Sequence, residues 1–134
     1  MESVIITKLL ATAGITALTS TRIRPGKAAA GDSLPYLVLR RISGGTENML
    51  GAAGTAYLAR IQIDCIAATY SGARALADAV TAGLNGHRDI AASPRIDSVM
   101  LTDETDDDFT PTDGGDFPIH RVIQDYQVCF DTGA

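Results

Sequence analysis

The chain has few of the residues from which metal sites and disulfide-rich domains are built. Its 134 residues include two cysteines, two histidines and no tryptophan. Cys65 and Cys129 have no CxxC partner, so the common zinc-site spacings are absent. Because both lie in strand-like runs, we expect buried free thiols in a reducing compartment, with a structural disulfide as the less favoured alternative.

Sequence motifs for catalysis are also missing. The chain contains no GxGxxG, GxxxxGK[ST], GxSxG or HExxH. His87 lies beside Arg88 in a predicted loop and His120 lies at the start of the last strand-like run, and neither has a metal ligand at suitable spacing. We interpret both as surface or packing residues. The sequence therefore predicts no enzyme, no catalytic residue, no cofactor and no metal.

Long apolar runs are absent as well. No run approaches the roughly 18–20 residues of a membrane span, and the N-terminus lacks the pattern of a secretory signal. A chain of this length is sufficient for one domain with its own core. We expect a single soluble domain over residues 1–134, located in the cytosol.

Charge is distributed unevenly along the chain. Asp and Glu number 16, Lys and Arg number 11, and the net charge is −5. Seven acids lie between Asp103 and Asp116 without a basic residue, so the remainder of the chain is slightly positive. We interpret this segment as a solvated hairpin loop, with a divalent-cation site at Asp103–Asp108 or an electronegative surface as alternatives. The chain has no basic stripe with interleaved aromatics, which argues against a nucleic-acid reader.

The clearest local pattern is a strand followed by a helix. Apolar residues alternate from Tyr57 to Ala67, with Arg60, Gln62 and Asp64 on the other face, which predicts a half-buried strand. The spacing then changes to that of an amphipathic helix. We expect Thr69 or Ser71 to cap its start and Asn85-Gly86 to close its end. The helical stripe comprises Ala73, Leu76, Ala77, Val80 and Leu84.

The remaining segments complete an α+β pattern. We predict a first helix over Glu2–Ala13 that Gly14 ends or interrupts, and we leave 15–21 undecided. The predicted strands are a short edge strand at 22–24 and longer ones at 34–42, 96–102 and 119–130, with a long mobile loop at 43–55. Gln124 interrupts the apolar face of the last strand. This order favours a mostly antiparallel sheet of four to five strands with two main helices packed on one face and one crossover.

Four segments in this order resemble one protein family. They are RIRPG at 22–26, LPYLVLRRISGG at 34–45, ARIQIDCIAATYSGARALADAV at 59–80 and DYQVCF at 125–130. The chain resembles the tail-completion proteins of long-tailed bacteriophages, also called tail terminators or tail-to-head joining proteins. The resemblance covers nearly the whole chain. The sequence departs from the family pattern in its few aromatics near the end and its acidic 103–116 segment.

The resemblance implies a structural role in the virion. Proteins of this family assemble as a hexameric ring that caps the tail tube, ends tail polymerisation and meets the head connector, with DNA passing through the hole. The implied partners are other copies of the chain, the tail tube protein, a head-completion or connector protein and passing DNA, with no membrane. The implied location is the neck of the virion, after assembly in the host cytoplasm. No catalytic residue or cofactor follows from the family.

Two regions are candidates for contacts in such a ring. The basic residues near 22–27 and 40–41 are interpreted as solvated edges or as ion-pair donors to acids of a neighbouring subunit. Asp106, Asp107 and Asp108 are predicted to face the channel, where negative charge repels phosphates. The candidate interface residues are Arg40, Arg41, Glu47, Asn48, Met49, Leu50, Arg60, Gln62 and Asp64. Two rival functions are another neck ring, such as a stopper protein, and a small metal-dependent hydrolase that uses the 103–108 acids.

Overall fold

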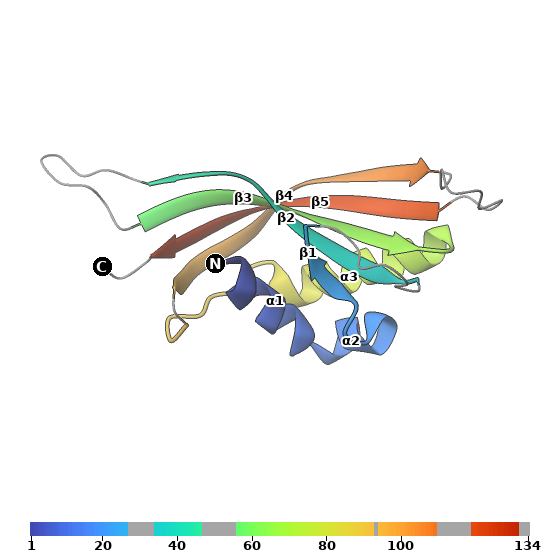
Figure 1. The fold of residues 1–134 in the computed structure, drawn as a ribbon, viewed down its shortest axis with the longest axis horizontal. Helices are drawn as coiled ribbons and strands as arrows, with labels where there is room; N and C mark the ends of the chain where they lie inside the picture. The colour runs from blue at the N-terminus through green and yellow to red at the C-terminus, as the bar shows by residue number, and fades with distance from the viewer. Residues whose placement is uncertain (27–33, 47–55, 93, 110–118, 132–134) are drawn as a thin grey trace, which may run out of the picture.

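A five-stranded sheet with three helices against one of its faces forms the described part of the chain (Figure 1). The computed structural model describes residues 1–26, 34–46, 56–92, 94–109 and 119–131. This arrangement is the predicted α+β class. The elements are α1 (Glu2–Leu10), α2 (Ala13–Thr19), β1 (Ile23–Pro25), β2 (Tyr36–Thr46), β3 (Ala56–Ala67), α3 (Tyr70–Leu84), β4 (Arg95–Phe109) and β5 (Ile119–Asp131).

The strands lie in the order β1-β2-β3-β5-β4. β1 runs parallel to β2, and the other neighbouring pairs are antiparallel. Because β5 lies between β3 and β4, the connection through α3 passes across β5, which confirms the predicted crossover. β3 is the central strand, as its strict alternation of apolar and polar residues indicates.

The core lies between the sheet and the helices. On β3, Ile61, Ile63 and Cys65 are fully buried, and on α3 the predicted stripe is buried as well. α1 and α2 add the buried Ile5, Leu9 and Ile15. Each large aliphatic side chain removed from water in this way contributes roughly 1.5–3 kcal/mol. The helices therefore cover one face of the sheet and leave the other uncovered.

The ends of α3 follow the predicted capping pattern. Thr69, rather than Ser71, is the N-cap, and its Oγ1 accepts a hydrogen bond from Gly72 N at 3.0 Å. Gly86 has a φ of +79°, as expected for the residue that closes the helix, whereas Asn85 is extended. Asn85 Oδ1 accepts from Leu101 N at 2.9 Å, so the helix end is joined directly to β4.

The prediction of one N-terminal helix over 2–13 is wrong. α1 ends at Leu10 and α2 begins at Ala13, with an 84° bend between them. The break lies at Thr12, which is extended (φ −92°, ψ 106°) and donates its hydroxyl to Lys8 O, while Gly14 lies inside α2. In the part of the chain that the structure describes, no single helix is long and apolar enough to cross a membrane; only the bent pair reaches that length and composition.

Two strands are longer than predicted. β2 continues to Thr46 after a register shift between Arg41 and Ser43, and β4 continues to Phe109 instead of ending at Thr102. The interpretation of 103–109 as a loop is therefore wrong. Pairing with β5 and ion pairs from neighbouring elements offset the low strand propensity of Asp. Residues 47–55 and 110–116 of the two predicted loops lie outside the described residues.

The prediction for the cysteines is confirmed in its main point. Both thiols are free, Cys65 on β3 and Cys129 on β5. Cys65 is fully buried, and Cys129 is half-buried. Burial, and then the neighbouring Asp64 carboxylate, raise the pKa of the Cys65 thiol.

Candidate functional site

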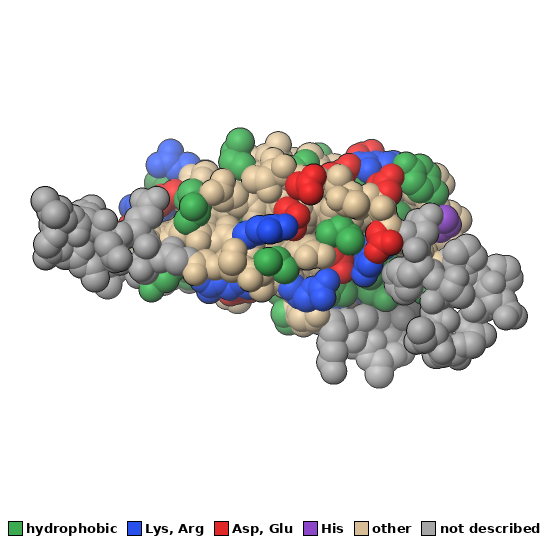
Figure 2. Space-filling view, turned by 90° about the horizontal axis from the view of Figure 1, so that it is seen from above, with side chains coloured by type: hydrophobic (Ala, Val, Ile, Leu, Met, Phe, Trp, Pro, Cys, Tyr) green, Lys and Arg blue, Asp and Glu red, His purple; other side chains and the backbone are tan. Residues whose placement is uncertain are grey.

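The face of the sheet turned away from the helices carries four of the five predicted interface residues that the structure describes. Because strand side chains alternate, the polar residues of β3 and those opposite them on neighbouring strands share this face. Figure 2 shows basic and acidic side chains interleaved there with neutral polar and hydrophobic ones. We call this surface the open face. Its residues include Arg40, Leu58, Arg60, Gln62, Asp64, Met100, Asp103, Asp107, Arg121 and Asp125.

One chain of ion pairs crosses all four long strands on the open face. Arg40 Nη2 of β2 lies 3.1 Å from Asp64 Oδ2 of β3. The same oxygen lies 3.8 Å from Arg121 Nη1 of β5, and Arg121 also pairs with Asp107 of β4. Gln62 Nε2 donates to the other oxygen of Asp64 at 3.0 Å. Asp64 is therefore the anion that connects two cations across the sheet.

A second pair lies beside this chain. Arg60 Nη2 donates to Asp125 Oδ2 at 2.8 Å, and Thr102 Oγ1 donates to the backbone oxygen of Asp125 at 3.1 Å. Asp64 is only 4% exposed and Asp125 only 8%. The prediction that Asp64 lies on a wet face is therefore wrong, because Gln62, Arg40 and Arg121 cover it. In both pairs the carboxylate is buried while the arginine, Arg40 or Arg60, remains about half exposed.

The acidic segment is divided between the two faces of β4. Glu104 and Asp106 lie opposite Gln124 and Val122 of β5 and face α3, whereas Asp103 and Asp107 lie on the open face. Tyr70 and Arg74 of α3 bind Asp106. The described carboxylates do not converge, and the described residues contain no group of three or more His, Cys, Asp or Glu that could hold a metal ion.

Beneath β4 and β5, a buried polar cluster joins the sheet to α3. Gln124 is fully buried, and its Nε2 lies within hydrogen-bond distance of Glu104 Oε2 (2.8 Å), Thr81 Oγ1 (2.9 Å) and Ala77 O (3.1 Å). Burial raises the pKa of Tyr126, which donates to Gln124 Oε1, to about 12. The polar residue that interrupts the apolar face of β5 is thus satisfied internally.

Arg74 anchors the same cluster at its exposed side. Its guanidinium lies 2.6 Å from Glu104 and 3.1 Å from Asp78. The hydrogen bond to Asp78 raises the pKa of Arg74 above its ordinary value, and Glu104 adds to this against the effect of burial. The cluster fixes α3 on the sheet and leaves no reactive group in an open cleft.

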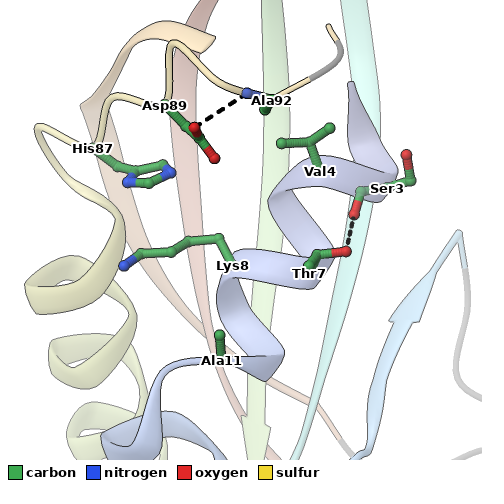
Figure 3. A pocket seen from close by; sticks show the side chains of 8 residues that line it. All are labelled: Ser3, Val4, Thr7, Lys8, Ala11, His87, Asp89 and Ala92. Carbon is green, nitrogen blue, oxygen red and sulfur yellow. Dashed lines mark hydrogen bonds between the residues drawn. The ribbon is translucent and has the colours of Figure 1, made fainter. Parts of the chain in front are cut away.

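A hollow of about 410 Å³ lies between α1 and the loop after α3 (Figure 3). The Lys8 side chain extends toward His87 there, and partial burial, followed by the Lys8 charge, lowers the pKa of His87. Asp89 Oδ1 accepts hydrogen bonds from the backbone N–H groups of Ala91 and Ala92. The carboxylate is thus used to shape the loop, and the described residues of the lining include no nucleophile paired with a base.

The structure brings together some of the predicted interface residues and separates others. Arg40, Arg60, Gln62 and Asp64 share the open face. Arg41 faces the helices instead, with Nη1 3.8 Å from Glu2 and its guanidinium carbon 5.9 Å from the centre of the Phe130 ring. Glu47, Asn48, Met49 and Leu50 lie outside the described residues, as does the side chain of Asp108.

Two residues of the open face, Arg121 and Asp125, are missing from the residues that the sequence singled out. The signal that could have found them is their parity. They alternate with the buried Val122, Gln124 and Tyr126, so they lie on the same face as the polar residues of β3. Because Gln124 is a polar residue at one of the buried positions, the alternation is not obvious in the sequence.

Comparison with known proteins identifies the family. The model of the family "Tail completion protein gp17" matches residues 3–131. No curated protein sequence matches the chain. Among solved structures, a chain of "Virion of native gene transfer agent (GTA) particle" superposes with a TM-score of 0.70 at 17% identity, covering 95% of this chain and 91% of that one. At this identity the match shows a shared fold. Because the family model covers nearly the whole sequence, the chain belongs to the tail completion protein gp17 family and is a structural protein of a phage tail.

Proposed function

We propose that this tail protein forms a ring that closes the end of the tail tube, stops further polymerisation and joins the tail to the head. The observation that carries the proposal is the family match, which spans residues 3–131 and thus both faces of the sheet. A protein that completes a polymer must contact the last ring of that polymer and prevent the addition of another. A sheet with one face covered by helices and one open face offers separate surfaces for such contacts (Figure 1).

The chemistry of the described residues supports a structural role. The charged side chains of the open face are largely paired with one another, as Arg40, Asp64 and Arg121 are. The hollow beside α1 offers a lysine, a histidine and a carboxylate already bonded to backbone. These groups are suited to contacts with other proteins, and we propose that the protein acts without catalysis or cofactor.

DNA passage through the ring is part of the proposal. Affinity for DNA comes mainly from unpaired cations that neutralise phosphates. On the open face, Arg40, Arg60 and Arg121 each have a carboxylate partner, which lowers their attraction for phosphate. If this face lines the channel, Asp103 and Asp107 are the acidic residues that β4 contributes to it, whereas Asp106 is bonded to α3 on the other face. DNA would then slide past the ring with little binding.

Electron microscopy of particles made without this protein tests the proposal. We expect tails of abnormal length that are not joined to heads, and restoration of normal particles when the protein is supplied. Heads that lose their DNA while tails keep normal length would indicate a stopper or head-completion ring instead. Tails of normal length attached to filled heads would contradict both functions.

A further inference from the structure

We propose that neighbouring copies of this chain join edge to edge in the ring, with the outer edge of β4 over 102–109 pairing with the outer edge of β2 over 40–46 of the next copy. The inference rests on the proposed ring function and specifies its subunit contact. Three observations support it: which parts of the two outer strands lack a neighbouring strand, the charges that these strands carry, and the directions in which they run.

The first uncovered edge belongs to β2. β1 pairs only with the residues from Leu37 to Leu39, and Gly26 N adds one further bond to Leu39 O at 2.8 Å. From Arg40 onward, no residue in the described ranges pairs with this side of β2. Residues 40–44 are all exposed, and Ile42 is 44% exposed. An uncovered strand edge is a template for another strand.

The second uncovered edge belongs to the later half of β4. Its earlier half is covered from within the chain: Asp89 exchanges two backbone bonds of 2.9 Å with Ile96, Gly86 N donates to Val99 O at 2.7 Å, and Asn85 Oδ1 accepts from Leu101 N. After Leu101, nothing among the described segments continues this cover. Within the described ranges, each outer strand is therefore covered over one part and uncovered over the other.

The two edges carry opposite charge. The charged residues of β1 and β2 are Arg24, Arg40 and Arg41, without an acid. Asp103 is exposed, and no residue of the described part of the chain gives it a hydrogen bond or ion pair. β4 has one basic residue, Arg95, against the acids Asp97, Asp103, Glu104, Asp106, Asp107 and Asp108.

This charge distribution selects the kind of contact. Pairing β4 with β4 in a two-fold dimer would oppose like charges, and so would pairing β2 with β2. Pairing β4 with β2 opposes unlike charges and uses two different surfaces of each copy. A contact of that kind is heterologous and closes into a ring when the rotation permits.

Strand direction determines which residues meet. β2 and β4 run in opposite senses, because three antiparallel pairings separate them. Copies rotated about an axis roughly along the strands keep these senses, so the new pairing is antiparallel. Aligning the two uncovered stretches then brings Asp106 and Asp107 of one copy toward Arg40 and Arg41 of the next.

The stagger between the two stretches agrees with ring closure. Following the pairing across the sheet, Asp106 lies in the row of Leu37, and Arg41, which it meets in the next copy, lies in the row of Leu101. These rows are four residues apart on β2, which is about one residue of offset for each of the four long strands. Closed sheets need a stagger of this order, since eight strands with a shear of 8 tilt by about 36°.

Two charge-reversal variants, measured separately and then mixed, test the pairing. We expect R40E/R41E and D106R/D107R each to weaken self-association by at least about tenfold in sedimentation experiments at low salt. An equimolar mixture should recover to within about threefold of wild type, because each altered edge then meets its complement. R88E, in an exposed loop, should behave as wild type. Circular dichroism verifies that each variant is folded.

A cross-link provides a test that leaves these charges intact. In a C129S background, S43C with T105C places one thiol on each uncovered stretch. We expect a short bismaleimide to give a ladder of multimers up to a closed ring, in concentrated solution or in assembled tails. S43C alone should give dimers at most, and S43C with R88C should give no ladder.

The outcomes separate this inference from the proposed function. No ladder from the S43C/T105C pair, in solution and in tails that contain the protein, overturns the edge pairing while the ring function stands. If the S43C/T105C pair gives a ladder in solution but the protein is absent from assembled tails, the edge pairing is supported and the proposed function is overturned.

Discussion

The hydroxyl of Tyr126 donates a 2.9 Å hydrogen bond to Gln124 Oε1, two residues earlier on the same strand and inside the core. Both side chains are fully buried, so neither has water as an alternative partner. The amide of Gln124 bonds in turn to α3 and to Glu104. This bond is therefore the inner end of the polar cluster that holds the helix on the sheet.

Replacing Tyr126 with Phe should destabilise the protein although it preserves most of the packing. The change leaves Gln124 Oε1 buried without its donor, which costs about 1–3 kcal/mol. Urea unfolding followed by circular dichroism measures the loss. Tyr57→Phe is the matched control, because Tyr57 stacks on Phe130 at 5.1 Å and its hydroxyl has no hydrogen bond in the described part of the chain. An equal effect of both substitutions would contradict the role of the bond.

Stability should also fall at alkaline pH because of Tyr126. Its pKa is raised from the ordinary value near 10 to about 12 by burial, so the folded state favours the neutral phenol. The contribution of the neutral Tyr126 phenol to the free energy of unfolding is on the order of 2 kcal/mol. It is fully present below pH 10 and is lost as the pH rises through about 12. The difference in unfolding free energy between wild type and Tyr126→Phe should therefore narrow between pH 10 and 12. Cys65 titrates in both proteins and cancels in this difference. A difference that stays constant over this range would contradict the prediction.

Periodicity was sufficient to predict the centre of the fold. The alternation around Ile61 and Ile63 and the helical stripe around Leu76 follow from local spacing alone, and the structure confirms both. The extension of β4 over its acids could not be found in this way. It depends on cations from elsewhere in the chain, Arg74 on α3 and Arg121 on β5, which hold Asp106 and Asp107 in a strand.

The open face was predicted only in part for a related reason. Arg60, Gln62 and Asp64 share a parity that is visible in the sequence. Whether a polar strand face is wet depends, however, on what lies beside it in the sheet. Arg121 comes from a strand more than fifty residues later in the chain, and it contributes to the burial of Asp64. Partners so distant in sequence leave no local signal.

Asp64→Asn should lower the free energy of unfolding more than a comparable substitution at the margin of the sheet. It removes the anion that Arg40 and Arg121 share, and we expect a loss of about 1–3 kcal/mol in unfolding free energy, since both arginines keep some access to water. Asp97→Asn is the control: its pair with Arg95 is exposed, so the loss should stay below about 1 kcal/mol. Chemical denaturation of the two variants provides the comparison, and a smaller loss at Asp64 would refute the shared-anion interpretation.

Calorimetric titration with Mg²⁺, Mn²⁺ and Ca²⁺ should show no tight stoichiometric binding. Hard cations need several oxygen ligands directed at one point. On β4, Glu104 and Asp106 face α3 while Asp103 and Asp107 face the other way. Stoichiometric micromolar binding that D103N/D107N abolishes would contradict this geometry and would revive a metal-dependent hydrolase as a function.

The two thiols should react with Ellman's reagent at very different rates. Cys65 is fully buried on β3, and its raised pKa keeps it protonated at neutral pH, so it should react only when the protein unfolds. Cys129 is half-buried on β5 and should react in the native state. Cys129→Ser should remove the fast phase and leave one thiol that appears only in denaturant. Because the slow phase follows opening of the core, its rate should rise in Tyr126→Phe by the same free energy that urea unfolding records. A fast phase that survives Cys129→Ser would mean that β3 opens independently of the polar cluster beneath α3.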